Sequence, residues 1–165
     1  MSFLWAYILF MIELLIISWV DIRKAKISNY WPIINLALCI VFYLIPGGEY
    51  VWSWEILIFP IGLVIVGFLL FLINIMGAGD SKFLASLFLV IPLKYHQVFF
   101  ERIVITTLVI GFVSLTINIL KEKQNIRSLA LNNNWKDAFQ ALQSRFSYAP
   151  VIFIAWLTLG IFLWK

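Results

Sequence analysis

The chain has 165 residues, of which 64% are hydrophobic and only 12% charged, and its net charge is +4. Soluble domains are about half apolar and a quarter charged, so this composition excludes a soluble globular protein and predicts an integral membrane protein. Its length leaves room for about six helices of roughly 20 residues each. We therefore expect an all-α bundle of six transmembrane helices forming one domain, residues 1–165.

Six apolar segments alternate with polar connections along the chain. Pro32 lies in the first turn of the second segment, where a helix tolerates proline, and Pro46-Gly47-Gly48 is expected to end that segment. The third segment contains Pro60, Gly62 and Gly67, which predict close helix packing or a kink. The fourth is short enough to be re-entrant. The expected spans are 3–20, 30–45, 54–76, 83–93, 103–120 and 149–164.

The connections differ in their charge. Residues 94–102 are expected to form a mixed polar connection that carries the single histidine, His96. Residues 121–145 form the longest polar stretch, in which apolar side chains recur at helical spacing and predict an amphipathic helix on the membrane surface. Those side chains are Trp135, Ala138, Phe139 and Leu142.

Lysine and arginine near span ends indicate the cytoplasmic side of a membrane protein. The two basic connections are 21–29, with Arg23, Lys24 and Lys26, and 121–145. With six spans, both connections and the segment 77–82 fall on one side, whereas a re-entrant fourth segment would move 121–145 outside. Charge therefore favours six spans with both termini outside, and it places Asp21 and Asp80 at the same depth at the cytoplasmic end.

Two carboxylates at one depth can hydrolyse a peptide bond. Neighbouring carboxylates cannot both ionise cheaply, so one keeps its proton while the other acts as a base toward water. An alternative for Asp80 is purely structural, since Asp80 or Ser81 would suit the cap of the following helix. Gly77 and Gly79 would let an extended substrate backbone approach closely. Lys82 either keeps a cation near the carboxylates or simply anchors the cytoplasmic end.

Three stretches resemble the motifs of one family, the type IV prepilin peptidases, which are membrane aspartic proteases of the Gly-x-Gly-Asp class. Their first motif, an aspartate with a basic residue two positions on and then Ile-x-Asn, is similar to the stretch from Asp21 through Arg23 to Asn29. Their second, Gly-x-Gly-Asp-x-Lys, is similar to Gly77-Ala78-Gly79-Asp80-Ser81-Lys82. Phe146-Ser147-Tyr148-Ala149-Pro150 is similar to their Pro-Tyr-x-Pro region, with Ser147 in place of the usual proline.

This resemblance, which covers nearly the whole chain, implies that Asp21 and Asp80 form the catalytic pair, supported by Gly77, Gly79, Lys82, Arg23 and Asn29. It implies cleavage of pilin or pseudopilin precursors behind a short basic leader, at the cytoplasmic face of the cell membrane and without a cofactor. Larger family members carry an N-terminal segment with paired Cys-x-x-Cys motifs and also methylate their product. Here Cys39 is alone, so we expect peptidase activity only, as in the short forms associated with tight-adherence (Flp) pili. Archaeal preflagellin peptidases look similar.

Partners and other polar residues complete the expectations. We expect contact with membrane lipid and with a pilus-assembly machinery, and no binding of nucleic acid or metal. Glu13 is expected to be hydrogen-bonded inside the bundle, and three asparagines are expected to bond between helices: Asn35, Asn74 and Asn118. Two rival functions remain: a small transporter or channel component that uses carboxylates, and a non-catalytic assembly subunit in which Asp21 and Asp80 are boundary residues.

Overall fold

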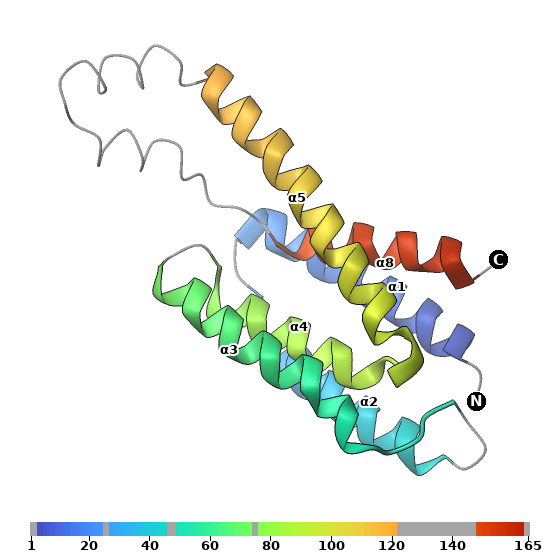
Figure 1. Ribbon diagram of the computed structural model, residues 1–165. Helices are drawn as coiled ribbons and strands as arrows, with labels where there is room; N and C mark the ends of the chain where they lie inside the picture. Colours follow the sequence, from blue (N-terminus) through green and yellow to red (C-terminus); the bar gives the residue numbers. More distant parts are fainter. Residues whose placement is uncertain (1–2, 25–26, 46–48, 74–75, 122–147, 164–165) are drawn as a thin grey trace.

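The computed structural model is an all-α bundle, described for residues 3–24, 27–45, 49–73, 76–121 and 148–163 (Figure 1). Its α-helices are α1 (Phe3–Lys24), α2 (Tyr30–Leu44), α3 (Ile58–Leu72), α4 (Ala78–Val90), α5 (His96–Lys121) and α8 (Ala149–Leu163). Two short 3-10 helices precede α3 and α5: η1 (Trp54–Leu57) and η2 (Leu93–Tyr95). The all-α membrane architecture expected from composition is thereby confirmed.

Among the described residues, three helical stretches are long and apolar enough to cross a membrane: Phe3–Arg23, Trp54–Leu72 and Leu93–Ile117. Two shorter apolar helices, Tyr30–Leu44 and Ala149–Leu163, accompany them. Helix α4 has only 13 residues, and most of its side chains are buried because α2 and α3 pack against it. It is the central helix of its half of the molecule, shorter than a typical span.

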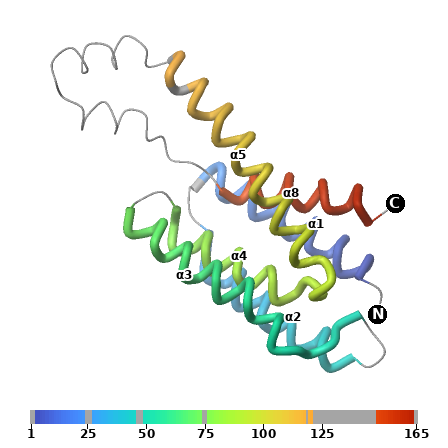
Figure 2. The backbone as a smooth tube through the Cα atoms, viewed as in Figure 1, coloured from blue at the N-terminus to red at the C-terminus, as the bar shows by residue number. Residues whose placement is uncertain are grey.

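The six α-helices in the part of the chain that the structure describes pack as two groups of three. Helix α8 packs against α1 and α5, and α4 packs against α2 and α3. Figure 2 shows these groups one above the other, with α1, α5 and α8 forming one and α2, α3 and α4 the other. The C-terminal end of α1 and the N-terminal ends of α2, α4 and α8 lie at the same end of the bundle, opposite the two termini of the chain (Figure 1). This shared end contains the candidate site.

Aromatic side chains join the two groups toward the other end. Phe99 of α5 lies between the two groups, with its ring centroid 5.3 Å from Trp156 of α8 and 5.2 Å from Phe88 of α4. Phe10 of α1 makes an edge contact with Phe42 of α2 at 6.3 Å. Aromatic burial of this kind stabilises a core beyond its apolar area, so the groups are joined firmly at the end away from the site.

The prediction of a polar connection at 94–102 was wrong. Helix α5 begins at His96, seven residues before the expected start of the fifth span. The His96 ring is buried between Phe59 and Phe88, with Nε2 2.9 Å from the carbonyl oxygen of Ile91. Polar residues of this segment lie on one face of α5 while the other face is buried, so the hydropathy of the sequence did not indicate a helix here.

Other boundaries differ by a few residues. Helix α1 continues to Lys24 instead of ending at Val20, and α4 begins at Ala78 instead of Phe83. Helix α3 ends at Leu72, not at Met76. Polar residues at helix ends remain helical here because their side chains point to water or to partners. The predictions for Pro46-Gly47-Gly48, Asn74, the side chain of Asn118 and the amphipathic helix within 121–145 lie outside the described residues.

The close packing expected at the third span occurs at Gly67. A Cβ atom at this position would overlap the Cβ of Ser81 on α4, whereas one at Gly62 would meet nothing within 4 Å. We therefore expect Gly67→Ala to separate α3 from α4 and to destabilise the protein by about 1–3 kcal/mol, as overpacking does. Gly62→Ala on the same helix is the matched control. Thermal unfolding in detergent measures both, and equal melting temperatures would contradict the prediction.

Candidate active site

Asp21 lies in the last turn of α1 and is buried, with 3% of its surface exposed. Its Oδ2 accepts a hydrogen bond from the backbone N–H of Ala149, the first residue of α8, at 3.2 Å. The N-terminus of a helix carries a partial positive charge and unpaired N–H donors. The burial of this carboxylate is therefore compensated by α8, an element 128 residues away in the sequence.

Asp80 lies in the first turn of α4, and its carboxylate turns back to the start of the helix. Its Oδ2 accepts the backbone N–H of Gly77, the N-cap residue, at 3.2 Å. This is the acidic half of a capping box, so the structural role considered for Asp80 is present. The bond engages one carboxylate oxygen and does not preclude a second role for the other.

The two carboxylates are close enough to interact electrostatically. Burial is the main cause that raises the pKa of Asp80 to about 6, and the negative charge of Asp21 raises it further, while the bond from Gly77 opposes both. A pKa raised by a neighbouring negative charge is typical of a carboxylate pair. Asp21 comes from one three-helix group and Asp80 from the other, so the pair is assembled only where the groups meet.

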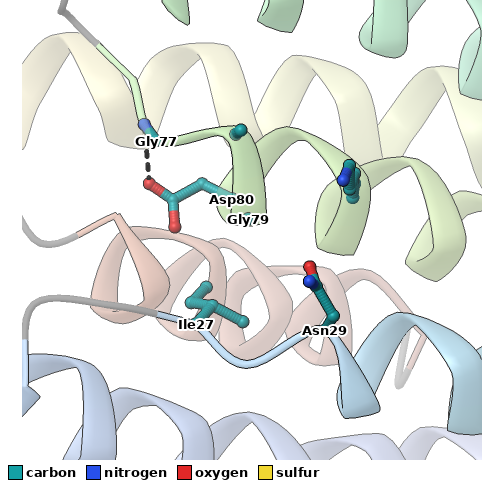
Figure 3. A pocket seen from close by; sticks show the side chains of 7 residues that line it. Ile27, Asn29, Gly77, Gly79 and Asp80 are labelled. Atoms are coloured by element: carbon teal, nitrogen blue, oxygen red, sulfur yellow. Dashed lines mark hydrogen bonds between the residues drawn. The ribbon is translucent and has the colours of Figure 1, made fainter.

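A pocket of about 280 Å³ opens beside Asp80. Figure 3 shows the Asp80 carboxyl group directed toward the segment between α1 and α2, with Ile27 and Asn29 on that wall. The opposite wall is the start of α4, so the pocket joins the two sequence motifs. Its lining residues are Ile27, Asn29, Gly77, Ala78, Gly79, Asp80 and Lys82.

Gly79 is the point where the two motifs touch. A Cβ atom at Gly79 would lie 2.8 Å from the backbone carbonyl oxygen of Ile27. That obstacle is main chain, which cannot rotate away as a side chain can. Glycine is thus needed here for a close approach of two backbones, a role that the sequence pattern did not reveal.

Two of the predicted site residues are placed differently from the rest. Arg23 is exposed on α1, and its guanidinium lies 4.5 Å from the centroid of the Trp19 ring, so it is not part of the pocket wall. Asp21 is also absent from the wall, because it lies deeper, against α8. Asn29, Gly77, Gly79, Asp80 and Lys82 all line the pocket.

Tyr148 and Thr107 are further polar residues near the carboxylates. The Tyr148 hydroxyl lies 3.0 Å from Thr107 Oγ1. Burial raises the pKa of the Tyr148 phenol; the bond to Thr107 lowers it, and the charge of Asp80 raises it. The sequence indicates Tyr148 only through the motif it belongs to, and nothing in the sequence points to Thr107. Ser147 lies outside the described residues.

The profile of the type IV leader peptidase family matches residues 8–121, which include both aspartates and most of the bundle. The chain belongs to this family. No curated protein and no solved structure gives a significant match. Membership in the type IV leader peptidase family identifies the molecule as a membrane peptidase and confirms the resemblance found in the two motifs.

The raised pKa of Asp80 has a consequence for stability. Its ordinary pKa is 3.8 and its folded value is about 6, so between these values the folded protein holds a proton that the unfolded chain has lost. The contribution of Asp80 to the stability of the folded protein is therefore largest below pH 3.8 and decreases as pH rises to about 6. We expect the melting temperature of the wild type to fall relative to that of Asp80→Asn across this window. Parallel curves for the two proteins in detergent would contradict the coupling.

Proposed function

We propose that this protein is an aspartic endopeptidase that removes the short leader from type IV pilin-like precursors at the cytoplasmic face of the membrane. Asp21 and Asp80 are the catalytic pair in this proposal, and no cofactor takes part. Gly77, Gly79, Asn29 and Lys82 support the site by shaping the pocket. Family membership supports the peptidase activity and a substrate of the prepilin type.

The observation that carries the proposal is the electrostatic coupling of Asp21 with Asp80. Burial and the charge of Asp21 raise the pKa of Asp80 to about 6, so Asp80 keeps its proton to a higher pH than an ordinary aspartate does, beside a second carboxylate. A singly protonated pair of carboxylates is what peptide hydrolysis requires. Interacting carboxylates share their protons, so the acid and base roles are assigned to the pair and not to either residue.

The chemistry follows from that single proton. The ionised carboxylate takes a proton from a water molecule as the water oxygen bonds to the scissile carbonyl carbon, and the protonated carboxyl donates a hydrogen bond to the carbonyl oxygen. When the C–N bond breaks, a proton passes from the pair to the departing amine. Water has then been added across the peptide bond, and the pair again holds one proton.

The pocket suits a stretch of extended peptide. Gly77 and Gly79 carry no side chain, so a substrate backbone can lie close to Asp80, and Asn29 offers amide groups on the facing wall. Lys82 lines the same pocket and brings a positive charge. The apolar helix that follows the leader would lie in the membrane against the bundle, which holds the scissile bond at the depth of the carboxylates.

Co-expression with a pilin precursor from the same genome tests the proposal. We expect the wild-type protein to shorten the precursor, and mass spectrometry of the product to show one new N-terminus between the leader and the apolar helix. Glu55→Gln, which alters an exposed carboxylate in η1, the 3-10 helix before α3, is expected to cleave at the wild-type rate. A wild-type protein that inserts normally but leaves every pilin-like precursor of its genome uncut would contradict the proposal.

A further inference from the structure

A second polar cluster lies deeper in the bundle, between the two helix groups. Glu13 of α1, Asn35 of α2 and Ser86 of α4 are all buried, with exposed fractions of 7%, 0% and 4%. With the Asn35 side-chain amide oriented so that its nitrogen faces Glu13 and its oxygen faces Ser86, the nitrogen lies 3.0 and 3.1 Å from the two carboxyl oxygens of Glu13. The amide oxygen then lies 3.3 Å from the Ser86 hydroxyl, which can donate to it in place of the Phe83 carbonyl oxygen that lies 2.8 Å away.

This cluster crosses the boundary that the carboxylate pair also crosses. Glu13 belongs to the group of α1, α5 and α8, whereas Asn35 and Ser86 belong to the group of α2, α3 and α4. Glu13 precedes Asp21 by eight residues, about 12 Å along a helix, and Ser86 follows Asp80 by six residues, about 9 Å. Glu13 and Ser86, the members of the cluster on α1 and α4, therefore lie at similar distances from the aspartate on the same helix.

We propose that Glu13 is a positioning residue for the carboxylate pair: through Asn35 and Ser86 it holds α1 and α4 in the register that brings Asp21 to Asp80. This inference rests on the proposed function for its catalytic consequence. The aromatic contacts of Phe10, Phe88 and Phe99 join the groups toward the opposite end, so the cluster is the polar connection between them on the way to the site. Apolar packing alone is non-directional, whereas hydrogen bonds from the Asn35 amide nitrogen to the Glu13 carboxylate set both distance and orientation.

The decisive variant is the double substitution Glu13→Leu with Asn35→Leu. It replaces both partners with apolar side chains, so no buried polar group is left unpaired and the bundle is expected to stay folded. We expect kcat for precursor cleavage to fall about 10- to 100-fold, because small displacements of catalytic groups have effects of that size. KM and the melting temperature should remain at their wild-type values.

Two further variants separate positioning from simple packing. Glu13→Gln keeps a side-chain oxygen that can accept from Asn35, and it is expected to retain wild-type kcat. Tyr7→Phe removes a hydrogen bond of 3.2 Å from the Tyr7 hydroxyl to the Trp156 carbonyl, which lies within one helix group, and it is also expected to leave kcat unchanged. A Glu13→Gln protein as slow as the double variant would overturn the proposal.

Helix position is measured without any substrate. Spin labels at Ile22 and Leu72, both exposed, report the distance between the two groups near the site, and labels at Ile33 and Leu72 report a distance within one group. In a Cys39→Ala background, the double variant should shift or broaden the first distance and leave the second unchanged. An unchanged first distance overturns the proposal, as does a shifted distance with wild-type kcat. A wild type that cleaves no precursor counts against the proposed function alone.

Discussion

Asp21→Asn and Asp80→Asn should each reduce precursor cleavage by about a thousand-fold or more, because each removes one member of a pair that must hold a single proton. Neither change alters the size of the side chain. An amide oxygen at position 21 can still accept the N–H of Ala149, and one at position 80 can still accept the N–H of Gly77. Both variants should therefore insert and fold, and initial rates of cleavage by purified protein measure the loss.

The double variant sharpens this test. Residues that act as one unit show strongly non-additive effects, so the combined Asp21→Asn and Asp80→Asn protein should be about as slow as either single variant. Independent contributions would instead multiply. Variants that cleave at the wild-type rate, with normal insertion, would return both residues to the role of helix-boundary carboxylates.

Gly79→Ala is expected to reduce cleavage by about a hundred-fold, since a shift of about 1 Å in a catalytic group has an effect of this size. The added Cβ would lie 2.8 Å from the carbonyl oxygen of Ile27 and 3.6 Å from its carbonyl carbon. This close contact is relieved only if the segment between α1 and α2 moves away from α4. That movement widens the pocket beside Asp80 and separates the two motifs.

Gly111→Ala is the matched control, because a Cβ atom there would meet nothing within 4 Å. We expect Gly111→Ala to cleave at the wild-type rate and Gly79→Ala to remain folded, with kcat measured for both in detergent. If Gly79→Ala were fully active, the contact with Ile27 would not constrain the site. A Gly79→Ala protein that failed to insert would show that the contact serves folding.

The sequence by itself determined the class of the protein, because hydrophobic composition and the length of apolar segments follow directly from the thickness of a bilayer. It also singled out Asp21 and Asp80 as candidate site residues, since a charged residue between apolar spans is costly and stands out. The order of the two motifs was enough to indicate the family. None of these inferences required knowledge of which helix contacts which.

Helix boundaries were less accurate for an identifiable reason. His96 and Asp21 are polar, so each was placed outside a helix, yet both are helical and buried with hydrogen-bond partners. A hydropathy pattern records the cost of burying a polar group but not the partner that offsets it. That partner is supplied by another element and is invisible until the chain is folded.

Tertiary structure alone decided how the site is built. Only the packing of α8 on α1 brings the N–H of Ala149 to Asp21, and only the close approach of two backbones explains Gly79. The same packing places Glu13, Asn35 and Ser86 together from three helices. Contacts between residues distant in sequence depend on the relative position of whole helices, which local pattern does not encode, whereas the burial of apolar segments does follow from the local pattern.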